Sequence, residues 1–334
     1  MLLFSAQISV FSQNLKLFPP EKGMYFGAFP DMGDSEDSVT ADRINNFKSL
    51  VSNPPVWIYF SNNWFKGIKF PMESVKIISE LGYIPYIRMM PRSDFTCCRS
   101  DPVYKLKKFL KGDFDSDLKK WAVDAKNFGK PLIVEFGTEV NGDWFPWSAI
   151  YNQNPKPVDG SILFADVYRH IINICKTEGA NNITWVFHVN YDSSPQKKWN
   201  KMKNYYPGDE YIDWIGVSIY GAQKPGDSWV SFSKILSQCY SELCGISDTK
   251  PIGVMEFGAI EDYNGLKVEW LDNAFLCLTL GKYPRIKAIS YWHSRWTNEN
   301  GSISNMRLDS SPEVLNVFNE LINNNFFKPQ IIFK

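Results

Sequence analysis

Short apolar runs alternate with amphipathic segments along most of the chain, and this alternation predicts the fold. Eight runs are rich in β-branched and aromatic residues and are far too short to cross a membrane, which is typical of buried strands. They lie at residues 24–29, 56–60, 84–89, 131–134, 183–188, 213–219, 251–255 and 286–291.

Segments with apolar residues at helical spacing separate these runs. The clearest are residues 73–81, 115–128, 163–178, 230–243, 266–280 and 312–323. A strand that is apolar on both faces needs helices on each side of its sheet, as parallel βα units provide. Eight such units close naturally into a barrel. We therefore expect an α/β protein, a (β/α)8 TIM barrel in a single domain.

The barrel is expected to span residues 21–334, because no strong linker and no internal repeat interrupts this range. Residues 1–20 are expected to form an N-terminal leader or extension. The first eleven residues, MLLFSAQISVF, are apolar, but no basic residue precedes Lys16, so the segment matches a signal peptide only in part. From it we expect a secreted or extracellular protein, with a cytoplasmic location left open.

Charge and cysteine usage narrow the classes of partner. The chain of 334 residues has 36 basic and 36 acidic side chains, and no basic stripe indicates nucleic acid. The six cysteines form no CxxC pattern, and His188 and His293 with Asp192 lack a third metal ligand at usable spacing. We expect a monomer with no metal, no other cofactor, no nucleic-acid partner and no membrane span.

The fourth apolar run continues into an unusual stretch, PLIVEFGTEVNGDWFPW, residues 131–147. In a (β/α)8 barrel, functional side chains lie at the carboxyl ends of the strands. This strand leads to Glu139, which Trp144 and Trp147 follow closely. Flat aromatic faces beside a carboxylate suit a sugar ring, whose C–H faces pack on them while its hydroxyls need polar partners. The stretch therefore indicates carbohydrate chemistry.

A second carboxylate, Glu256, ends the seventh run, and the ends of strands four and seven face each other across a barrel mouth. Glycoside hydrolysis uses one protonated and one ionised carboxyl, and a separation of about 5–5.5 Å gives retention of configuration. Aromatic surroundings raise a carboxyl pKa, and hydrogen bonds lower it. We therefore predict Glu139 as the acid/base and Glu256, within reach of the Tyr220 hydroxyl, as the nucleophile.

Three motifs at these strand ends resemble glycoside hydrolase family 26. GTEVNGDWFPW is similar to the family's acid/base motif, usually His-Glu-Met-Asn-Gly-x-Trp followed by aromatics; VMEFG resembles its nucleophile motif; DWIGVSIYG resembles the strand-six motif that ends in Tyr220. The resemblance covers about residues 25–326. It implies a retaining endo-β-glycanase, most often a β-mannanase (mannan endo-1,4-β-mannosidase), in which Trp144 and Trp292 stack on sugars near the cleaved bond.

Several side chains near strand ends are expected to bind the polysaccharide or oligosaccharide substrate: Trp144, Tyr220, Trp292, His188, Trp147, Asn141 and Trp64. Other interpretations stay open for some of them. Packing in the core explains Trp64 and Trp147 at least as well as substrate contact does. Tyr220 could simply be a rim residue, and His188 could contact the carboxylates rather than a sugar.

Two positions depart from the family's pattern. Thr138 stands where the family usually has His, and Glu135 where it usually has Arg. With a period of two along a strand, Glu135 and Glu139 should point the same way, which would place Glu135 deeper in the barrel. There it would need a partner, and we expect Arg88 on the neighbouring strand to form an exchanged ion pair with it.

These departures leave the substrate open. β-Mannan is expected first, and mixed-linkage β-glucan, for an endo-β-glucanase or lichenase, and β-xylan are the alternatives. A catalytically inactive carbohydrate-binding barrel is the alternative from another class of protein. A site that only binds has no need of an acid and nucleophile pair, so the presence of both Glu139 and Glu256 favours an enzyme.

Overall fold

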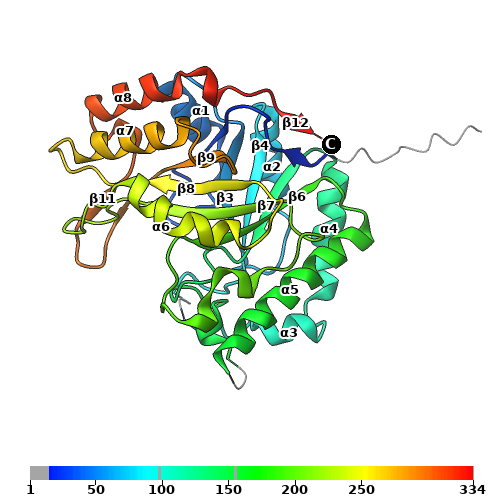
Figure 1. The fold of residues 1–334 in the computed structure, drawn as a ribbon. Coiled ribbons are helices and arrows are strands. Elements are labelled where there is room, and N and C mark those ends of the chain that lie inside the picture. Colours follow the sequence, from blue (N-terminus) through cyan, green and yellow to red (C-terminus); the bar gives the residue numbers. More distant parts are fainter. Residues whose placement is uncertain (1–14, 97–98, 154–155, 334) are drawn as a thin grey trace, which may run out of the picture.

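A computed structural model describes residues 15–96, 99–153 and 156–333. In this part of the chain, eight parallel strands follow one another in sequence order and close into a barrel (Figure 1). They coincide with the eight predicted runs, so the (β/α)8 prediction is confirmed. The strands are β2 (Tyr25–Pro30), β3 (Trp57–Asn63), β4 (Ile84–Met90), β5 (Leu132–Phe136), β6 (Ile183–Asn190), β7 (Trp214–Tyr220), β8 (Ile252–Gly258) and β9 (Ile286–His293).

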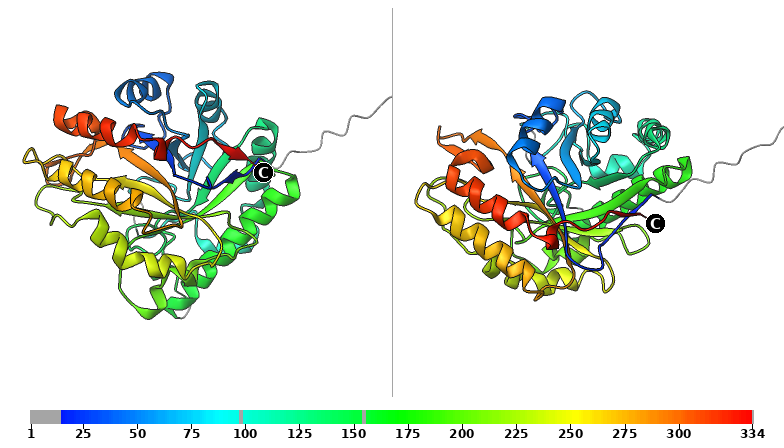
Figure 2. Two further views of the ribbon diagram at one scale, coloured as in Figure 1. Left: turned by 45° about the horizontal axis from the view of Figure 1, so that its top comes forward. Right: turned by 90° about the horizontal axis from the view of Figure 1, so that it is seen from above.

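Helices pack around the outside of the strands (Figure 2). Their ends carry ordinary signals: the Thr40 hydroxyl accepts from the Arg43 backbone N–H at the start of the first helix, and Ser311 does the same for Val314 at the start of the last. The helices are α1 (Ala41–Leu50), α2 (Met72–Glu80), α3 (Leu106–Leu110), α4 (Asp115–Phe128), α5 (Pro157–Glu178), α6 (Phe232–Cys244), α7 (Leu266–Thr279) and α8 (Pro312–Ile322). Short 3-10 turns lie at Ala149–Tyr151, Lys198–Asn200, Met202–Tyr205, Leu308–Ser310 and Asn325–Phe327.

Aromatic side chains fill much of the barrel interior. Trp57, Tyr59 and Tyr86 are fully buried, and the ring centroids of the two tyrosines lie 4.3 Å apart. Gly27 of β2 leaves the space that the indole occupies, because a Cβ at this position would lie 1.9 Å from Trp57 Nε1. These rings form a rigid floor under the charged side chains near the barrel mouth.

The amino-terminal face of the barrel is covered by a small sheet in which β1 (Leu17–Phe18) pairs with β12 (Ile332–Phe333). The backbone of Leu17 accepts from Trp214 Nε1 at 2.8 Å and donates to the Thr184 hydroxyl at 2.8 Å, and Lys16 forms an ion pair with Asp213 at 2.9 Å. The predicted boundary at residue 20 therefore falls inside a packed segment. Residues 1–14 of the predicted leader lie outside the described residues.

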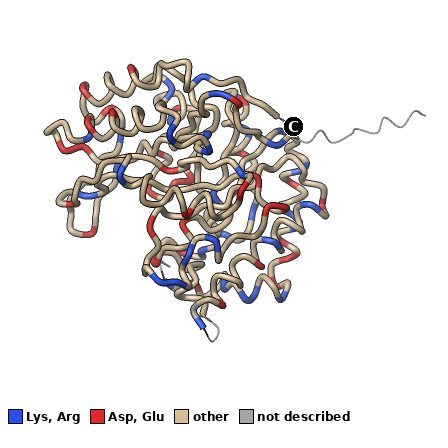
Figure 3. The backbone as a smooth tube through the Cα atoms, in the orientation of Figure 1, with Lys and Arg blue, Asp and Glu red and all other residues tan. Residues whose placement is uncertain are grey.

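A hairpin that the sequence pattern did not predict follows β9 at the opposite, carboxyl-terminal face. Its strands are β10 (Arg295–Thr297) and β11 (Ile303–Asn305). Acidic and basic residues are interspersed over the molecule (Figure 3). Among the described residues, none of the helices is both long enough and apolar enough to span a bilayer.

Candidate active site

A cleft with a volume of about 870 Å³ opens where the barrel strands end. Side chains from most of the loops after the strands contribute to its wall, as expected for the carboxyl-terminal face of such a barrel. The cleft is large enough for several sugar rings. Its lining includes Glu36, Arg88, Glu139, Trp144, Tyr220, Glu256, Trp292 and Trp296.

Glu139 reaches the cleft through a break in the strand geometry. β5 ends at Phe136, and both Gly137 and Glu139 then adopt left-handed backbone conformations, with φ values of 63° and 51°. The alternation expected between Glu135 and Glu139 therefore does not apply, because the chain is no longer extended between them. A non-glycine residue is rarely held in this region unless its surroundings require it, and here the turn directs the Glu139 carboxyl into the cleft.

The indole of Trp144 is folded back onto this turn. Its Nε1–H donates to Glu139 Oε2 at 2.7 Å, and the Gly142 backbone N–H donates to the Glu139 carbonyl at 2.9 Å. A Cβ on Gly142 would lie 2.5 Å from the indole ring, so only glycine allows the ring to lie this close. The turn and the indole therefore fix the position of the Glu139 carboxyl together.

Glu256 is buried at the end of β8 and accepts hydrogen bonds from two neighbouring side chains. Arg88 Nη1 donates to its Oε1 at 2.8 Å, and Tyr220 donates to Oε2 at 2.7 Å. The Tyr59 hydroxyl, whose single proton is shared with Glu135, lies 3.2 Å from Oε1. The predicted contact between Tyr220 and Glu256 is confirmed. Burial raises the pKa of Glu256 to about 7, against the opposing charge of Arg88, and the nearby Glu139 adds to the rise.

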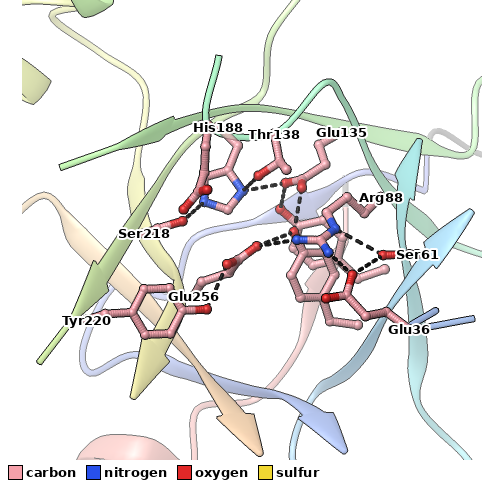
Figure 4. A network of polar contacts seen from close by, with 12 residues as sticks. Glu36, Ser61, Arg88, Glu135, Thr138, His188, Ser218, Tyr220 and Glu256 are labelled. Atoms are coloured by element: carbon pink, nitrogen blue, oxygen red, sulfur yellow. Dashed lines mark hydrogen bonds and ion pairs between the residues drawn. The ribbon is translucent and has the colours of Figure 1, made fainter. Parts of the chain in front are cut away.

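Arg88 joins two carboxylates at the barrel mouth (Figure 4). Besides Glu256, its guanidinium contacts Glu36 through Nη2 and donates from Nε to the Ser61 hydroxyl at 3.1 Å. The exchanged ion pair predicted between Arg88 and Glu135 is wrong. The two residues are register partners on β4 and β5, but the long guanidinium side chain extends past Glu135 to the carboxylates nearer the strand ends.

Glu135 is instead paired with His188, on the next strand. Its Oε2 lies 2.8 Å from His188 Nδ1, and it also accepts hydrogen bonds from Tyr59 and, at 2.6 Å, from Tyr86. Burial disfavours the charged form of each residue, but the opposite charge and the hydrogen bond of its partner have the larger effect. The pKa of Glu135 is therefore lowered, and the pKa of His188 is raised. Both shifts favour the charged forms, an imidazolium beside a carboxylate.

The two flanking hydroxyls hold the imidazole of His188 in place. Thr138 Oγ1 lies 3.1 Å from Nδ1, and Ser218 Oγ lies 3.0 Å from Nε2. Thr138, the second departure from the family's pattern, therefore lies directly beside His188 (Figure 4). The two unusual positions, Glu135 and Thr138, belong to one hydrogen-bonded cluster below the cleft.

One group within the described residues has the spacing of a metal site: ligand atoms of Glu135, His188 and Glu256 lie within 4.8 Å of one another. These atoms are already used by hydrogen bonds. Glu135 accepts from two tyrosines and pairs with His188, and Glu256 accepts from Arg88. A guanidinium at 2.8 Å would repel a cation, so this group is better described as a network of charged and hydroxyl side chains.

The remaining predicted site residues separate into two groups. Trp144, Tyr220 and Trp292 line the cleft, where Trp292 is largely buried and stacks on Phe29 with ring centroids 3.9 Å apart. The other four are buried and do not line the cleft, so the structure corrects their prediction as sugar contacts: Trp64, Trp147, Asn141 and His188.

Each of these buried residues has a structural environment instead. Trp64 packs on Tyr104, with ring centroids 5.3 Å apart, and Trp147 donates to the Thr138 carbonyl at 2.8 Å. Asn141 ties the loop after β5 to the end of β6, since it accepts from the Asn190 backbone N–H at 2.7 Å and donates to the Asn190 carbonyl at 2.9 Å. Packing in the core therefore explains both tryptophans.

Glu36 and Trp296 are among the cleft residues that the sequence analysis did not predict. Glu36 lies in the loop between β2 and α1, where acidic side chains are common because they face a helix amino terminus. Trp296 lies on β10 of the unpredicted hairpin. The only available signal was their position shortly after barrel strands, which many residues without function share.

A (β/α)8 barrel with two glutamates and aromatic rings in one cleft at its carboxyl-terminal face is typical of the barrel glycoside hydrolases. The model of Glycosyl hydrolase family 26 matches residues 100–247. This match and the relatives below confirm the resemblance to glycoside hydrolase family 26 that the strand-end motifs predicted.

Curated relatives carry two kinds of name. Endoglucanase H of Acetivibrio thermocellus is 32% identical over 214 residues, which are 63% of this chain and 22% of that protein. Mannan endo-1,4-beta-mannosidase of Bacillus subtilis is 24% identical over 176 residues, and mannan endo-1,4-beta-mannosidase A and B of Caldalkalibacillus mannanilyticus is 26% identical over 180 residues. These matches cover 52% and 53% of this chain, and 42% and 31% of those proteins. The chain therefore spans less than half the length of each relative.

Solved structures share the fold over nearly the whole chain. The catalytic domain of the Bacillus sp. JAMB-750 endo-beta-1,4-mannanase is 18% identical with a TM-score of 0.66, covering 95% of this chain and 94% of that one. The β-mannanase from a symbiotic protist of the termite Reticulitermes speratus, complexed with gluco-manno-oligosaccharide, is 15% identical with a TM-score of 0.58, covering 92% and 89%. At this identity the likeness establishes the fold alone.

Proposed function

We propose that the protein is a retaining endo-β-glycanase that hydrolyses a β-1,4-linked polysaccharide by double displacement. The observation that carries this proposal is the setting of Glu256. It is buried at the bottom of the cleft with Arg88, Tyr59 and Tyr220 directed at its two oxygens, and Glu139 lines the same cleft. A carboxylate held in this way beside a second carboxyl group is what a covalent glycosyl-enzyme mechanism requires.

The two carboxyl groups take different roles. Glu256 attacks the anomeric carbon, and Glu139 gives its proton to the departing glycosidic oxygen; Glu139 then takes a proton from the water that hydrolyses the ester and restores Glu256. The indole of Trp144 donates to Glu139 Oε2, which leaves Oε1 to carry the transferred proton. Because Arg88 donates to Oε1 of Glu256 and Tyr220 donates to Oε2, these two side chains orient the attacking carboxylate.

Aromatic side chains would bind the sugar rings. Trp144 is half-buried and presents part of its indole to the cleft beside Glu139. Trp292 contributes a ring that Phe29 supports from behind, and Trp296 adds another aromatic surface from the hairpin. Rigid rings of this kind bind sugars at little entropic cost, because few bonds have to be fixed.

β-Mannan is the first candidate substrate, since mannan endo-1,4-beta-mannosidases recur among the curated relatives. β-Glucan is the second candidate. The relative named Endoglucanase H has the higher identity, 32%, and the longer matched segment, 214 residues. The cluster of Glu135 and Thr138 below the cleft also departs from the family's pattern. A change in the side chains beneath the cleft can change which sugar the cleft accepts.

Hydrolysis of purified polysaccharides tests this proposal. Reducing ends released from mannan, glucomannan, mixed-linkage glucan and xylan should reveal one preferred substrate, with the β-configuration retained in the first product by NMR. Glu256→Gln should lower kcat by at least about a thousandfold and leave oligosaccharide binding intact. Wild-type protein that binds oligosaccharides but hydrolyses none of these polysaccharides would establish the inactive carbohydrate-binding barrel instead.

A role outside the cell follows from the proposed substrate, because such polysaccharides do not cross membranes. We propose that the protein is extracellular and acts as a monomer. Fractionation of producing cells with an antibody against the protein tests its location, and sedimentation tests its oligomeric state. Protein recovered only from the cytoplasm would contradict the proposed location.

A further inference from the structure

Arg88 is shared between two carboxylates, and only one of them belongs to the nucleophile. Nη1 donates to Glu256 Oε1, and Nη2 contacts Glu36 Oε2 on the other side of the guanidinium (Figure 4). The side chains of Arg88 and Glu256 are each 5% exposed, whereas Glu36 is 26% exposed and faces the cleft. The mechanism given above uses Arg88 and Glu256 but leaves Glu36 without a role.

Hydrogen bonds to both the backbone and the side chain of Glu36 hold it against Arg88. The Ser61 N–H donates to the Glu36 carbonyl at 2.8 Å, and the Ser61 hydroxyl donates to Glu36 Oε2 at 2.8 Å. The backbone of Glu36 is left-handed, with φ of 61°, and its N–H donates to the Gly33 carbonyl at 2.9 Å. Such a conformation is unfavourable for glutamate, so the surrounding contacts impose this position.

We propose that Glu36 is a positioning residue that keeps the buried Arg88 charge-compensated while Glu256 is esterified to the sugar. The inference rests on the proposed retaining mechanism. Glu36 does not touch the reacting atoms and acts through Arg88.

The charges of the first chemical step explain why a second carboxylate is needed. An oxygen of Glu256 forms a bond to the anomeric carbon, the glycosidic C–O bond breaks, and its electron pair takes the proton of Glu139. Glu256 changes from an anion to a neutral ester, and Glu139 becomes an anion. Arg88 would then be a buried cation without its partner, which is costly. Glu36 takes no part in the reaction and, through its ion pair with Arg88, supplies that partner.

The same arrangement affects the free enzyme. Arg88 is paired with Glu36 as well as with Glu256, and the negative charge of Glu36 offsets part of its positive charge. Arg88 therefore stabilises the Glu256 carboxylate less than it would without Glu36. Removing the charge of Glu36 should therefore favour ionised Glu256 and shift its titration to lower pH. The groups that face Arg88 and Glu256 are Glu36, Tyr59, Ser61, Glu135, Glu139, His188, Tyr220 and Trp292.

Glu36→Gln tests the inference, because it keeps the size of the side chain and removes its charge. The rate profile is measured from pH 4 to 9 on an aryl glycoside of the preferred oligosaccharide, whose good leaving group makes attack by Glu256 visible. We expect the acid limb of kcat/KM to shift down by about one pH unit. We expect kcat to fall about tenfold with little change in KM, because the esterified state loses its compensation.

Asp37→Asn is the matched control. Asp37 is the neighbouring residue and carries the same charge, but it bonds to Ser35 and Asn63, does not contact Arg88 and does not line the cleft. This variant should keep the wild-type pH profile. A general loss of negative charge from the loop would shift both variants alike and would overturn the inference.

Glu36→Asp provides a second test if the glutamine variant does not fold. It keeps the charge but withdraws it from Arg88 by about one C–C bond, so the acid limb should shift in the same direction by a smaller amount. Profiles of both Glu36 variants that superimpose on the wild type would refute the inference. Failure of the wild-type protein to hydrolyse any glycan would refute the proposed function instead, so the two results are distinguishable.

Discussion

Arg88 and Glu256 form an ion pair of 2.8 Å across the barrel mouth, although they lie on the third and seventh strands of the barrel. Each side chain is 5% exposed, so water cannot replace either partner. The pair also places the charge of Arg88 beside Trp292, with Cζ 5.1 Å from the indole ring. The position of the proposed nucleophile therefore depends on a residue far from it in the sequence.

Arg88→Met should destabilise the protein and impair the proposed nucleophile. Removing one member of a buried ion pair leaves the other charge uncompensated, at a cost of about 3–5 kcal/mol in the free energy of unfolding. Arg88 also opposes the raised pKa of Glu256, so its loss should shift the acid limb of kcat/KM to higher pH. Urea unfolding and rate profiles measure the two effects.

Lys120→Met is the control for this variant. Lys120 forms an ion pair with Asp117 on the surface, where the side chains are 73% and 52% exposed. Its loss should change the free energy of unfolding by less than about 1 kcal/mol. Equal effects of the two substitutions would show that the buried position of Arg88 has no special importance.

As the pH is lowered, the wild-type enzyme should begin to lose activity near pH 7, well above the usual pKa of a carboxyl group. A nucleophile must be ionised, and burial raises the pKa of Glu256 from 4.5 to about 7. As pH falls below this value, Glu256 takes up a proton, so kcat/KM should fall about tenfold per pH unit below neutrality. Initial rates at low substrate concentration measure this limb. An acid limb centred near pH 4.5 would contradict the assignment.

Gly142→Ala should impair catalysis through Trp144. The added Cβ would lie 2.5 Å from the indole, which must then move and lose its hydrogen bond to Glu139. A displacement of this size near the acid/base should lower kcat between about ten- and a hundredfold. The comparison is Trp144→Phe, which keeps an aromatic ring but removes the N–H donor. If hydrogen bonding to Glu139 is important, both variants should lower kcat, most strongly for substrates with poor leaving groups.

Glu135→Gln should destabilise the protein in a pH-dependent way. The lowered pKa of Glu135 contributes stability above pH 4.5 that is lost as pH falls through its folded-state pKa. The raised pKa of His188 contributes stability below pH 6.5 that is lost as pH rises through its folded-state pKa. The difference in unfolding free energy from the wild type should therefore be largest, about 3–5 kcal/mol, between pH 4.5 and 6.5.

Asp115→Asn is the matched control for the buried pair. Asp115 pairs with His170 at 2.7 Å, but the side chains are 33% and 28% exposed. Solvent screens such a pair, so the variant should lose less than about 1 kcal/mol. A loss for Glu135→Gln that stays constant from pH 4 to 9 would show that its effect arises from packing and not from the ion pair.

The barrel could be predicted because its strands are marked by continuous apolar runs and its helices by spacing. The positions of Glu139, Tyr220 and Glu256 followed from the rule that functional residues lie at strand ends. The partner of Glu135 could not be predicted in this way. Register correctly places Arg88 beside Glu135 on adjacent strands, but a long side chain can select among several carboxylates. Which carboxylate Arg88 pairs with depends on distances across the barrel, and a local sequence pattern does not specify those distances.

Backbone reversals limited the prediction of the site in another way. The alternation of side chains holds only while the strand is extended, and the left-handed residues Gly137 and Glu139 end it. Glu36 is left-handed as well, with φ of 61°. Glutamate has no special preference for this conformation, so neither the residue type nor the sequence pattern around it indicates a turn there. Trp64 and Trp147 were ambiguous for a simpler reason, since aromatic residues are common both in cores and in sugar-binding clefts.

The pairing of β1 with β12 brings the two ends of the described chain to the face of the barrel opposite the cleft. A segment joined to either end would therefore extend away from the opening through which a polysaccharide enters. Fluorescent proteins, surface anchors or additional binding modules could be attached at this face without obstructing the substrate. Attachment at this face would leave the cleft, on the opposite face, open to the substrate.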